Sequence, residues 1–197
     1  MLGRSELEEA LETLGAVLEG RGEAYELLVA GGSSLLLLGL ISRPTADLDV
    51  IGLAEHGSYV KADRFPPGLA RAVSDVAATL ELAPSWLNNG PAALMDFGLP
   101  DGFQERIERR RFGALQVHIP ARADMICFKL YAAVDQGPRS KHFQDLREML
   151  PTAAELSAAA VWCQSQDLSS GFEGDLRAAI ARLASAQWSG DGSDAGS

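Results

Sequence analysis

The stretch from Gly31 to Val50, GGSSLLLLGLISRPTADLDV, decides how the rest of the chain is interpreted. It joins a glycine-rich turn to a short apolar run and ends in an Asp-x-Asp pair. The preceding run AYELLVAG is short, apolar and ends in glycine, which predicts a buried strand. The apolar run LLLLGLI predicts a short buried helix because it follows a Gly-Gly-Ser turn, and LDVIGL predicts a second strand.

Asp47 and Asp49 are two positions apart on this second strand, so their side chains are expected on one face, with Cα atoms about 6.6 Å apart. Leu48 and Val50 then face the core. Two carboxylates in this arrangement can hold one or two hard cations such as Mg²⁺. An Asp-x-Asp pair is also common on protein surfaces, so the pair alone does not establish a metal site.

The turn Gly31-Gly32-Ser33 is a candidate phosphate site. Glycine lets the backbone approach a phosphate closely, and the first N–H groups of the following helix point outward. Ser33 adds a hydroxyl, although the same sequence also suits an ordinary tight turn. Because the turn and the aspartates are expected at adjacent strand ends, together they favour a metal–triphosphate site. Arg43, just before Thr45 and Asp47, can brace the loop or reach a phosphate.

Before residue 121 the chain alternates helices and strands. Ser5 is predicted to open a capping box with Glu8 at the start of a first helix, and apolar spacing predicts another helix at 69–80. ALQVHIP (114–120) alternates strictly, which predicts a strand. Residues 84–113 are rich in proline, glycine and asparagine, so we expect mostly loop, with a short extended piece at SWLNN (85–89).

After residue 121 the pattern is helical, with four helices and a capping box at Thr152 and Glu155. We therefore predict an α/β (α+β) fold in which helices flank a small mixed sheet at 1–120. A helical part at 121–188 is expected to pack on that core, and residues 189–197 are expected to be disordered.

The net charge of −10 argues against broad electrostatic binding to nucleic acid. The N-terminus has the pattern of a charged amphipathic helix, and the longest apolar run is far shorter than a membrane span. We expect a cytoplasmic protein that does not enter the membrane, with Cys127 and Cys163 as buried free thiols. The arginine run RIERRRF (106–112) is either a solvated charged segment or a basic surface that binds RNA or polyphosphate electrostatically.

The stretch GGSSLLLLGLISRPTADLDV resembles the signature of the nucleotidyltransferase (DNA polymerase beta-like) superfamily. Its Gly-Gly-Ser and Arg-x-Thr-x-Asp-x-Asp elements are similar to those of the AbiEii toxin and of DUF6036 proteins, in which a Trp-Leu-Asn stretch like that at 86–88 also recurs. The resemblance implies a nucleotidyltransferase fold. It also implies that Gly32 and Ser33 hold nucleotide phosphates and that Asp47 and Asp49 are metal ligands.

A second stretch, FKLYAAVDQGPRSKHFQDL (128–146), matches the Lys and Lys-Asp-x-x-Asp elements of these families at Lys129 and Asp145. The first aspartate of that element is replaced by His142. Catalytic members of the superfamily also have a third acid on a later strand, where ALQVHIP offers Gln116 and His118 instead. Asp96 and Glu81 are acids whose place the sequence does not fix.

Two functions follow from this resemblance. One is an enzyme that uses Mg²⁺ (or Mn²⁺) to move a nucleoside monophosphate from a nucleoside triphosphate to a hydroxyl of RNA or protein. Its context could be a toxin–antitoxin pair with an antitoxin as partner. Its expected site combines catalytic Asp47, Asp49, Lys129 and Asp145 with nucleotide-binding Gly31, Gly32, Ser33, Arg43 and Thr45. The other is a catalytically inactive module that binds a nucleotide or a partner protein, as the missing acids allow.

Overall fold

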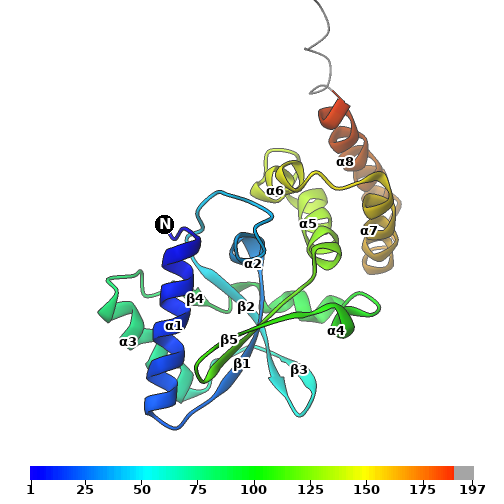
Figure 1. Cartoon of the computed structure of the whole chain (residues 1–197). Helices are drawn as coiled ribbons and strands as arrows, with labels where there is room; N and C mark the ends of the chain where they lie inside the picture. Colours follow the sequence, from blue (N-terminus) through cyan, green and yellow to red (C-terminus); the bar gives the residue numbers. More distant parts are fainter. Residues whose placement is uncertain (189–197) are drawn as a thin grey trace, which may run out of the picture. The chain divides into compact units, whose positions relative to one another are not determined.

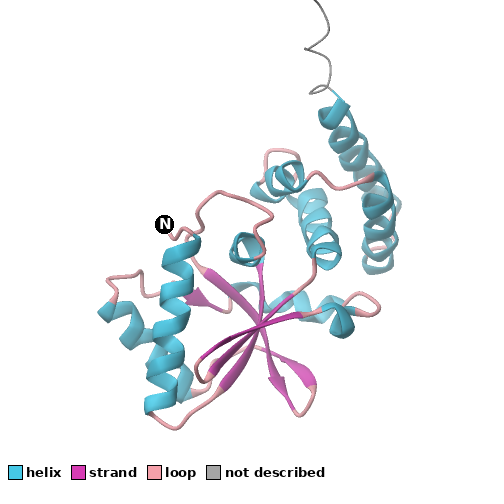
Figure 2. Cartoon of the chain, in the orientation of Figure 1, coloured by secondary structure: helices cyan, strands magenta, loops and turns pink. Residues whose placement is uncertain are grey.

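The computed structural model describes residues 1–188, and the predicted disordered tail at 189–197 lies outside that range. The described residues form two compact units, which divide between Ala121 and Arg122. The first unit mixes helices and strands, whereas the described part of the second unit is helical (Figure 2). The predicted α+β fold, with a mixed sheet flanked by helices and a helical C-terminal part, is confirmed.

The first unit is built on a six-stranded mixed sheet. Its strands are β1 (Tyr25–Ala30), β2 (Leu48–Glu55), β3 (Ser58–Lys61), β4 (Leu87–Asn88), β5 (Glu108–Phe112) and β6 (Leu115–Ile119). The strand order is β3-β2-β1-β6-β5, and β4 pairs with β2 outside this path. The central strand β1 runs parallel to β6 and antiparallel to β2. Its residues from Leu27 to Ala30 are all buried, which explains the continuous apolar run in the sequence.

The helices of this unit are α1 (Arg4–Gly20), α2 (Gly31–Leu37), α3 (Pro67–Thr79), the 3₁₀ helix η1 (Gly90–Phe97) and α4 (Phe103–Arg106). Helices α1 and α3 lie on one side of the sheet, and η1 and α4 lie on the other (Figure 1). The helical repeat of Leu7, Leu11 and Leu14 is fully buried, so α1 covers the sheet with its apolar face.

The capping box predicted at Ser5 is wrong. Helix α1 begins at Arg4, and its N-cap residue is Gly3, which provides no side-chain cap. Glu8, which was expected to reach back to the helix start, instead accepts a hydrogen bond from Arg4 at 3.0 Å.

The prediction that residues 84–113 are mostly loop is also wrong, because β4, η1, α4 and β5 lie there. The strand β5 contains the arginine run and pairs antiparallel with β6, from Glu108 opposite Ile119 to Phe112 opposite Leu115. At the edge of the sheet, charged side chains can remain solvated while the backbone pairs on one side. Composition alone therefore does not distinguish this strand from a charged loop.

The second unit contains α5 (Arg122–Gln136), α6 (Lys141–Met149), α7 (Ala153–Gln166) and α8 (Ser170–Trp188). Helix α5 contacts each of the other three. The predicted capping box of Thr152 and Glu155 is confirmed at the start of α7. Cys127 and Cys163 are buried free thiols, as predicted. Burial raises the pKa of Cys163 to about 12, which keeps this thiol protonated and unreactive.

Candidate active site

The Asp-x-Asp pair lies where β2 begins. Asp47 immediately precedes the strand and Asp49 is its second residue, and both are half-buried. Leu48 and Val50 are fully buried. This alternation is that of a strand with one face on the core, so the two aspartates are directed away from the face that carries Leu48 and Val50.

The side chain of Asn88 on β4 reaches both carboxylates. Strand β4 runs parallel to β2 and places Asn88 opposite Asp49. The amide nitrogen Nδ2 of Asn88 is 3.1 Å from Asp47 Oδ2 and 3.4 Å from Asp49 Oδ1. Sequence reasoning missed this role because it depends on which strand β4 pairs with. The recurrence of Trp-Leu-Asn in similar proteins is the signal that could have indicated it.

Gly31 borders the same carboxylate on the other side. Strands β1 and β2 pair Ala30 with Asp49, so α2 starts directly beside the aspartate. Gly31 has a φ of +79°, and a Cβ atom there would lie 2.2 Å from Asp49 Oδ2. Only glycine fits this backbone and this close approach without displacing Asp49.

Gly32 brings two more predicted residues to the site. A Cβ atom on Gly32 would lie 3.2 Å from a guanidinium nitrogen of Arg43 and 3.6 Å from the hydroxyl of Thr45. The Thr45 hydroxyl donates to the backbone carbonyl of Asp47 at 3.1 Å. The backbone of Thr45 is itself held by a two-way bridge to Leu2. The loop therefore presents Arg43 and Thr45 beside the first turn of α2.

Gly31, Gly32 and Ser33 form the first turn of α2, rather than a turn that precedes the helix as predicted. Ser33 is fully buried, and its hydroxyl donates to the Ala30 carbonyl at 3.3 Å. In this rotamer the hydroxyl closes the junction of β1 and α2. A role for Ser33 in holding phosphate stays a prediction.

The donors at β2 fit a hard divalent cation. In proteins Mg²⁺ is held by one or two carboxylates and takes its other ligands from water and substrate phosphates. Asp47 and Asp49 supply two carboxylates, and the absence of a side chain at Gly31 lets Asp49 Oδ2 approach the start of α2 closely. Across residues 1–188, no group of three or more His, Cys, Asp or Glu side chains could hold a metal ion. The carboxylate pair therefore has no third acidic partner within the first unit.

The later strand β6 supplies a buried histidine instead of an acid. His118 Nδ1 lies 2.8 Å from the Tyr59 hydroxyl, and Nε2 lies 2.7 Å from the Gln116 amide nitrogen and 3.0 Å from Glu26 Oε2. Burial lowers the pKa of His118, although the Glu26 carboxylate opposes this shift. His118 thus joins three strands through these contacts, which is a structural role.

The two acids that the sequence left unplaced lie outside this strand. Asp96 belongs to η1 and pairs with Lys61 Nζ at 2.6 Å. Glu81 follows α3 with a positive φ of 52°.

Lys129 and Asp145 belong to the second unit, on α5 and α6. Lys129 Nζ donates to Asp145 Oδ2 at 2.6 Å, and their side chains are 3% and 0% exposed. Such a pair is costly to desolvate and costlier to break. Their predicted catalytic roles rest on the family pattern, since the contact itself also suits a structural ion pair.

The arginine run has partners within the first unit. Arg110 pairs with Glu108 at 2.7 Å and lies 3.7 Å from Glu8, while Arg111 Nε donates to the Gly113 carbonyl at 3.0 Å. These contacts favour a solvated edge strand over an RNA-binding surface.

The carboxylate pair thus lies at a strand end, beside a helix that begins with two glycines on a mixed sheet. A family model described as a nucleotidyltransferase of unknown function (DUF6036) matches residues 5–150. The chain belongs to this family. No curated protein and no solved structure matches the chain. Within residues 1–188, every helix is too short or too polar to cross a lipid bilayer.

Proposed function

We propose that this protein is a metal-dependent nucleotidyltransferase that moves a nucleoside monophosphate from a nucleoside triphosphate to a hydroxyl of RNA or protein. The observation that carries the proposal is the close grouping of Asp47, Asp49 and Gly31 at the junction of β1, α2 and β2. Two carboxylates beside a glycine-initiated helix suit a cation that carries phosphate oxygens.

Nucleotide phosphates would lie against the first turn of α2. Gly31 and Gly32 have no side chain there, and the Arg43 guanidinium lies beside Gly32. A guanidinium can bind a phosphate through two parallel hydrogen bonds. Thr45 would fix the loop that carries both Arg43 and Asp47 through its bond to the Asp47 carbonyl.

In the proposed reaction, the acceptor hydroxyl oxygen forms a bond to the α-phosphorus while the bond to the pyrophosphate oxygen breaks. Pyrophosphate leaves with the electron pair, and the hydroxyl proton passes to solvent. Bound Mg²⁺ or Mn²⁺ would polarise the α-phosphate and assist deprotonation of the hydroxyl. Asp47 and Asp49 would hold that ion, and the α2 turn would keep the triphosphate tail in line.

The family pattern extends the proposal beyond the first unit. It assigns catalytic roles to Lys129 and Asp145. By resemblance to AbiEii, we also propose that this protein is the toxin of a toxin–antitoxin pair, with an antitoxin as partner. These assignments are analogies at the level of the fold and family.

The first test is calorimetric titration of ATP and GTP with and without Mg²⁺. Metal-dependent binding is expected for the wild type and its loss for Asp47→Asn/Asp49→Asn. Asp63→Asn is the matched control, because that exposed carboxylate lies 3.5 Å from Lys61 Nζ on the same unit. Asp49→Asn should also abolish transfer of an α-labelled nucleotide while circular dichroism stays unchanged. Retained transfer in that variant would rule out the mechanism.

The alternative is a catalytically inactive module that binds a nucleotide or a partner protein. The group at the start of β2 has two carboxylates rather than three, and this favours the alternative. Nucleotide that binds without metal and is recovered unchanged would support this alternative over the enzyme.

A further inference from the structure

Three neighbouring strand positions lie abreast at the proposed metal site. Ala30 on β1 pairs with Asp49 on β2, and Asp49 pairs with Asn88 on β4. Asn88 is thus the strand neighbour of Asp49 on the side away from the α2 turn. A residue at this place acts directly on the carboxylate pair.

The orientation of the Asn88 amide is set by its own backbone neighbour. The N–H of Gly90 lies 2.8 Å from Asn88 Oδ1. A backbone N–H can only donate, so the atom facing it must be the amide oxygen. The NH₂ group therefore faces Asp47 and Asp49, and its two protons can be donated one to each carboxylate.

The segment that carries Asn88 is anchored on both sides. The Trp86 indole donates to the Val73 carbonyl at 3.1 Å, and the Trp86 carbonyl accepts from the Leu48 N–H at 2.6 Å. Asn89 donates to the backbone carbonyls of Ala62 and Asp63 at 2.6 and 2.9 Å. Asn88 is therefore held in place by contacts that do not involve the carboxylates.

We propose that Asn88 is the positioning residue that holds Asp47 and Asp49 together as a two-carboxylate site for a divalent cation. Two carboxylates held close together repel each other, and a donor shared between them offsets this repulsion without adding charge. A cation then meets a site of charge −2, already arranged, instead of two carboxylates that must first be brought together. The inference rests on the proposed function, because it assumes that this pair binds a metal.

The test is Mn²⁺ affinity of the full chain, measured by electron paramagnetic resonance and by calorimetry without nucleotide. Asn88→Leu keeps a similar size but lacks both donor protons, and we expect affinity to fall about 10- to 100-fold, as for other residues that orient metal ligands. Asn88→Asp should bind about tenfold tighter, because an oxygen replaces Nδ2 and adds a third carboxylate.

Asn89→Leu is the matched control. It removes hydrogen bonds from the same segment but none to the carboxylates, so it should lower stability while Mn²⁺ affinity stays within about threefold of the wild type. A structural role for Asn88 alone predicts instead that both leucine variants behave alike.

The outcomes separate this inference from the proposed function. Binding by the wild type that Asp49→Asn abolishes, with Asn88→Leu indistinguishable from wild type, overturns the role of Asn88 and leaves the metal site intact. No Mn²⁺ binding by the wild type, either alone or with a nucleoside triphosphate, overturns both.

Discussion

Gly31 shows how one residue can control the geometry of the proposed site. Its φ of +79° is a conformation that L-residues rarely adopt, and a Cβ atom would be placed 2.2 Å from Asp49 Oδ2. The positive φ costs about 1–2 kcal/mol for a non-glycine residue. The clash of the Cβ atom with Asp49 must displace the carboxylate, because α2 and β2 are both anchored in the core.

We therefore expect Gly31→Ala to lower the free energy of unfolding and also to weaken Mn²⁺ binding. Gly57→Ala is the matched control, because Gly57 has a φ of +81° but nothing within 4 Å of the added Cβ. The control should lose about 1–2 kcal/mol without a change in Mn²⁺ affinity. Denaturant titration and calorimetry check both, and equal affinities in the two variants would contradict a direct contact with Asp49.

His118 is a second residue whose surroundings give a measurable effect. Burial lowers its pKa below the ordinary value of 6.5. The unfolded chain therefore binds a proton that the folded chain resists, so the native state loses stability as pH falls below about 6.5. This loss ends once pH is below the lowered pKa, where both states are protonated.

We predict that the wild type loses stability as pH falls from 7 to 5 and that His118→Gln removes part of this loss. Glutamine keeps polar atoms for Tyr59 and Gln116 but does not titrate. His56→Gln is the control, because His56 lies in the exposed turn between β2 and β3. Urea titrations at several pH values test this, and parallel pH profiles for His118→Gln and wild type would refute it.

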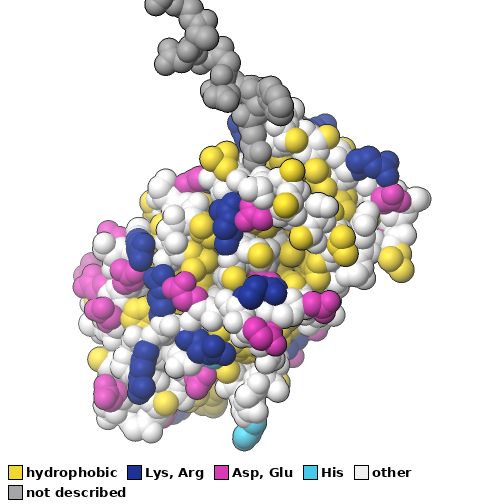
Figure 3. Space-filling view, turned by 45° about the vertical axis from the view of Figure 1, so that its right-hand side comes forward, with side chains coloured by type: hydrophobic (Ala, Val, Ile, Leu, Met, Phe, Trp, Pro, Cys, Tyr) yellow, Lys and Arg dark blue, Asp and Glu magenta, His cyan; other side chains and the backbone are white. Residues whose placement is uncertain are grey.

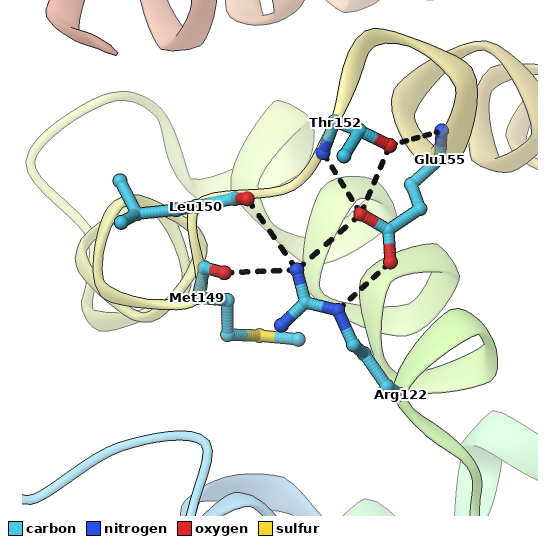
Figure 4. A network of polar contacts seen from close by, with 5 residues as sticks. All are labelled: Arg122, Met149, Leu150, Thr152 and Glu155. Atoms are coloured by element: carbon cyan, nitrogen blue, oxygen red, sulfur yellow. Dashed lines mark hydrogen bonds and ion pairs between the residues drawn. The ribbon is translucent and has the colours of Figure 1, made fainter.

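At the scale of elements, a polar network joins the ends of three helices in the second unit (Figure 4). Arg122 at the start of α5 donates to Glu155 on α7 at 2.8 Å and to the Met149 carbonyl at the end of α6 at 2.9 Å. Glu155 also accepts from the backbone N–H of Thr152 at 2.8 Å. One arginine thus satisfies a helix C-terminus and orients the cap of the next helix.

This network predicts a second loss of stability on acidification, at a lower pH than the loss that His118 causes. The Arg122 guanidinium, with the Thr152 N–H, holds the pKa of Glu155 at about 2, below its ordinary value of 4.5. Since the folded pKa is depressed, the stabilisation is complete above about pH 4.5 and is lost as pH falls toward about 2.

Glu155→Gln should cost about 1–2 kcal/mol at pH 7, after allowance for solvent screening, and much less at pH 2. Glu173→Gln is the control, because its pair with Arg177 is exposed and its loss should hardly change the free energy of unfolding. Guanidinium titrations across pH measure both. A cost for Glu155→Gln that is the same at pH 7 and pH 2 would argue against the charged network.

The elements differ in how far the sequence predicts them. Strands β1, β2 and β6 are predictable because their apolar residues have the burial that each run implies. Strand β5 is not, because Glu108 to Arg111 are charged and only pairing with β6 makes them a strand. The aspartates follow from local alternation, whereas Asn88 acquires its place through the pairing of β4 with a strand some 40 residues earlier in the chain.

At the scale of the whole molecule, the net charge of −10 limits how an acceptor can be bound. On the face drawn in Figure 3, basic side chains are interspersed with acidic ones rather than gathered in one area. Broad attraction of a phosphate backbone is therefore weak. If the proposed transfer takes place, this charge pattern favours an acceptor recognised through specific contacts, whether it is an RNA end or a protein hydroxyl.

The family match also bears on the second unit. It covers residues 5–150 and so extends past Ala121 through α5 and α6, whereas α7 and α8 lie beyond it. The buried pair of Lys129 and Asp145 lies within the matched part. A structural ion pair and a catalytic pair make different predictions for the same substitutions.

Removing one partner leaves a buried charge, so Lys129→Met or Asp145→Leu should each cost about 3–5 kcal/mol. The double variant Lys129→Met/Asp145→Leu removes both charges and should regain most of that stability, because buried pairs are often replaceable by apolar residues. Thermal and denaturant unfolding of all three variants measure this.

A folded double variant without nucleotide transfer would support the catalytic roles that the family pattern assigns. A folded double variant with full transfer would make Lys129 and Asp145 structural and confine the chemistry to other residues, of which Asp47 and Asp49 are the first candidates.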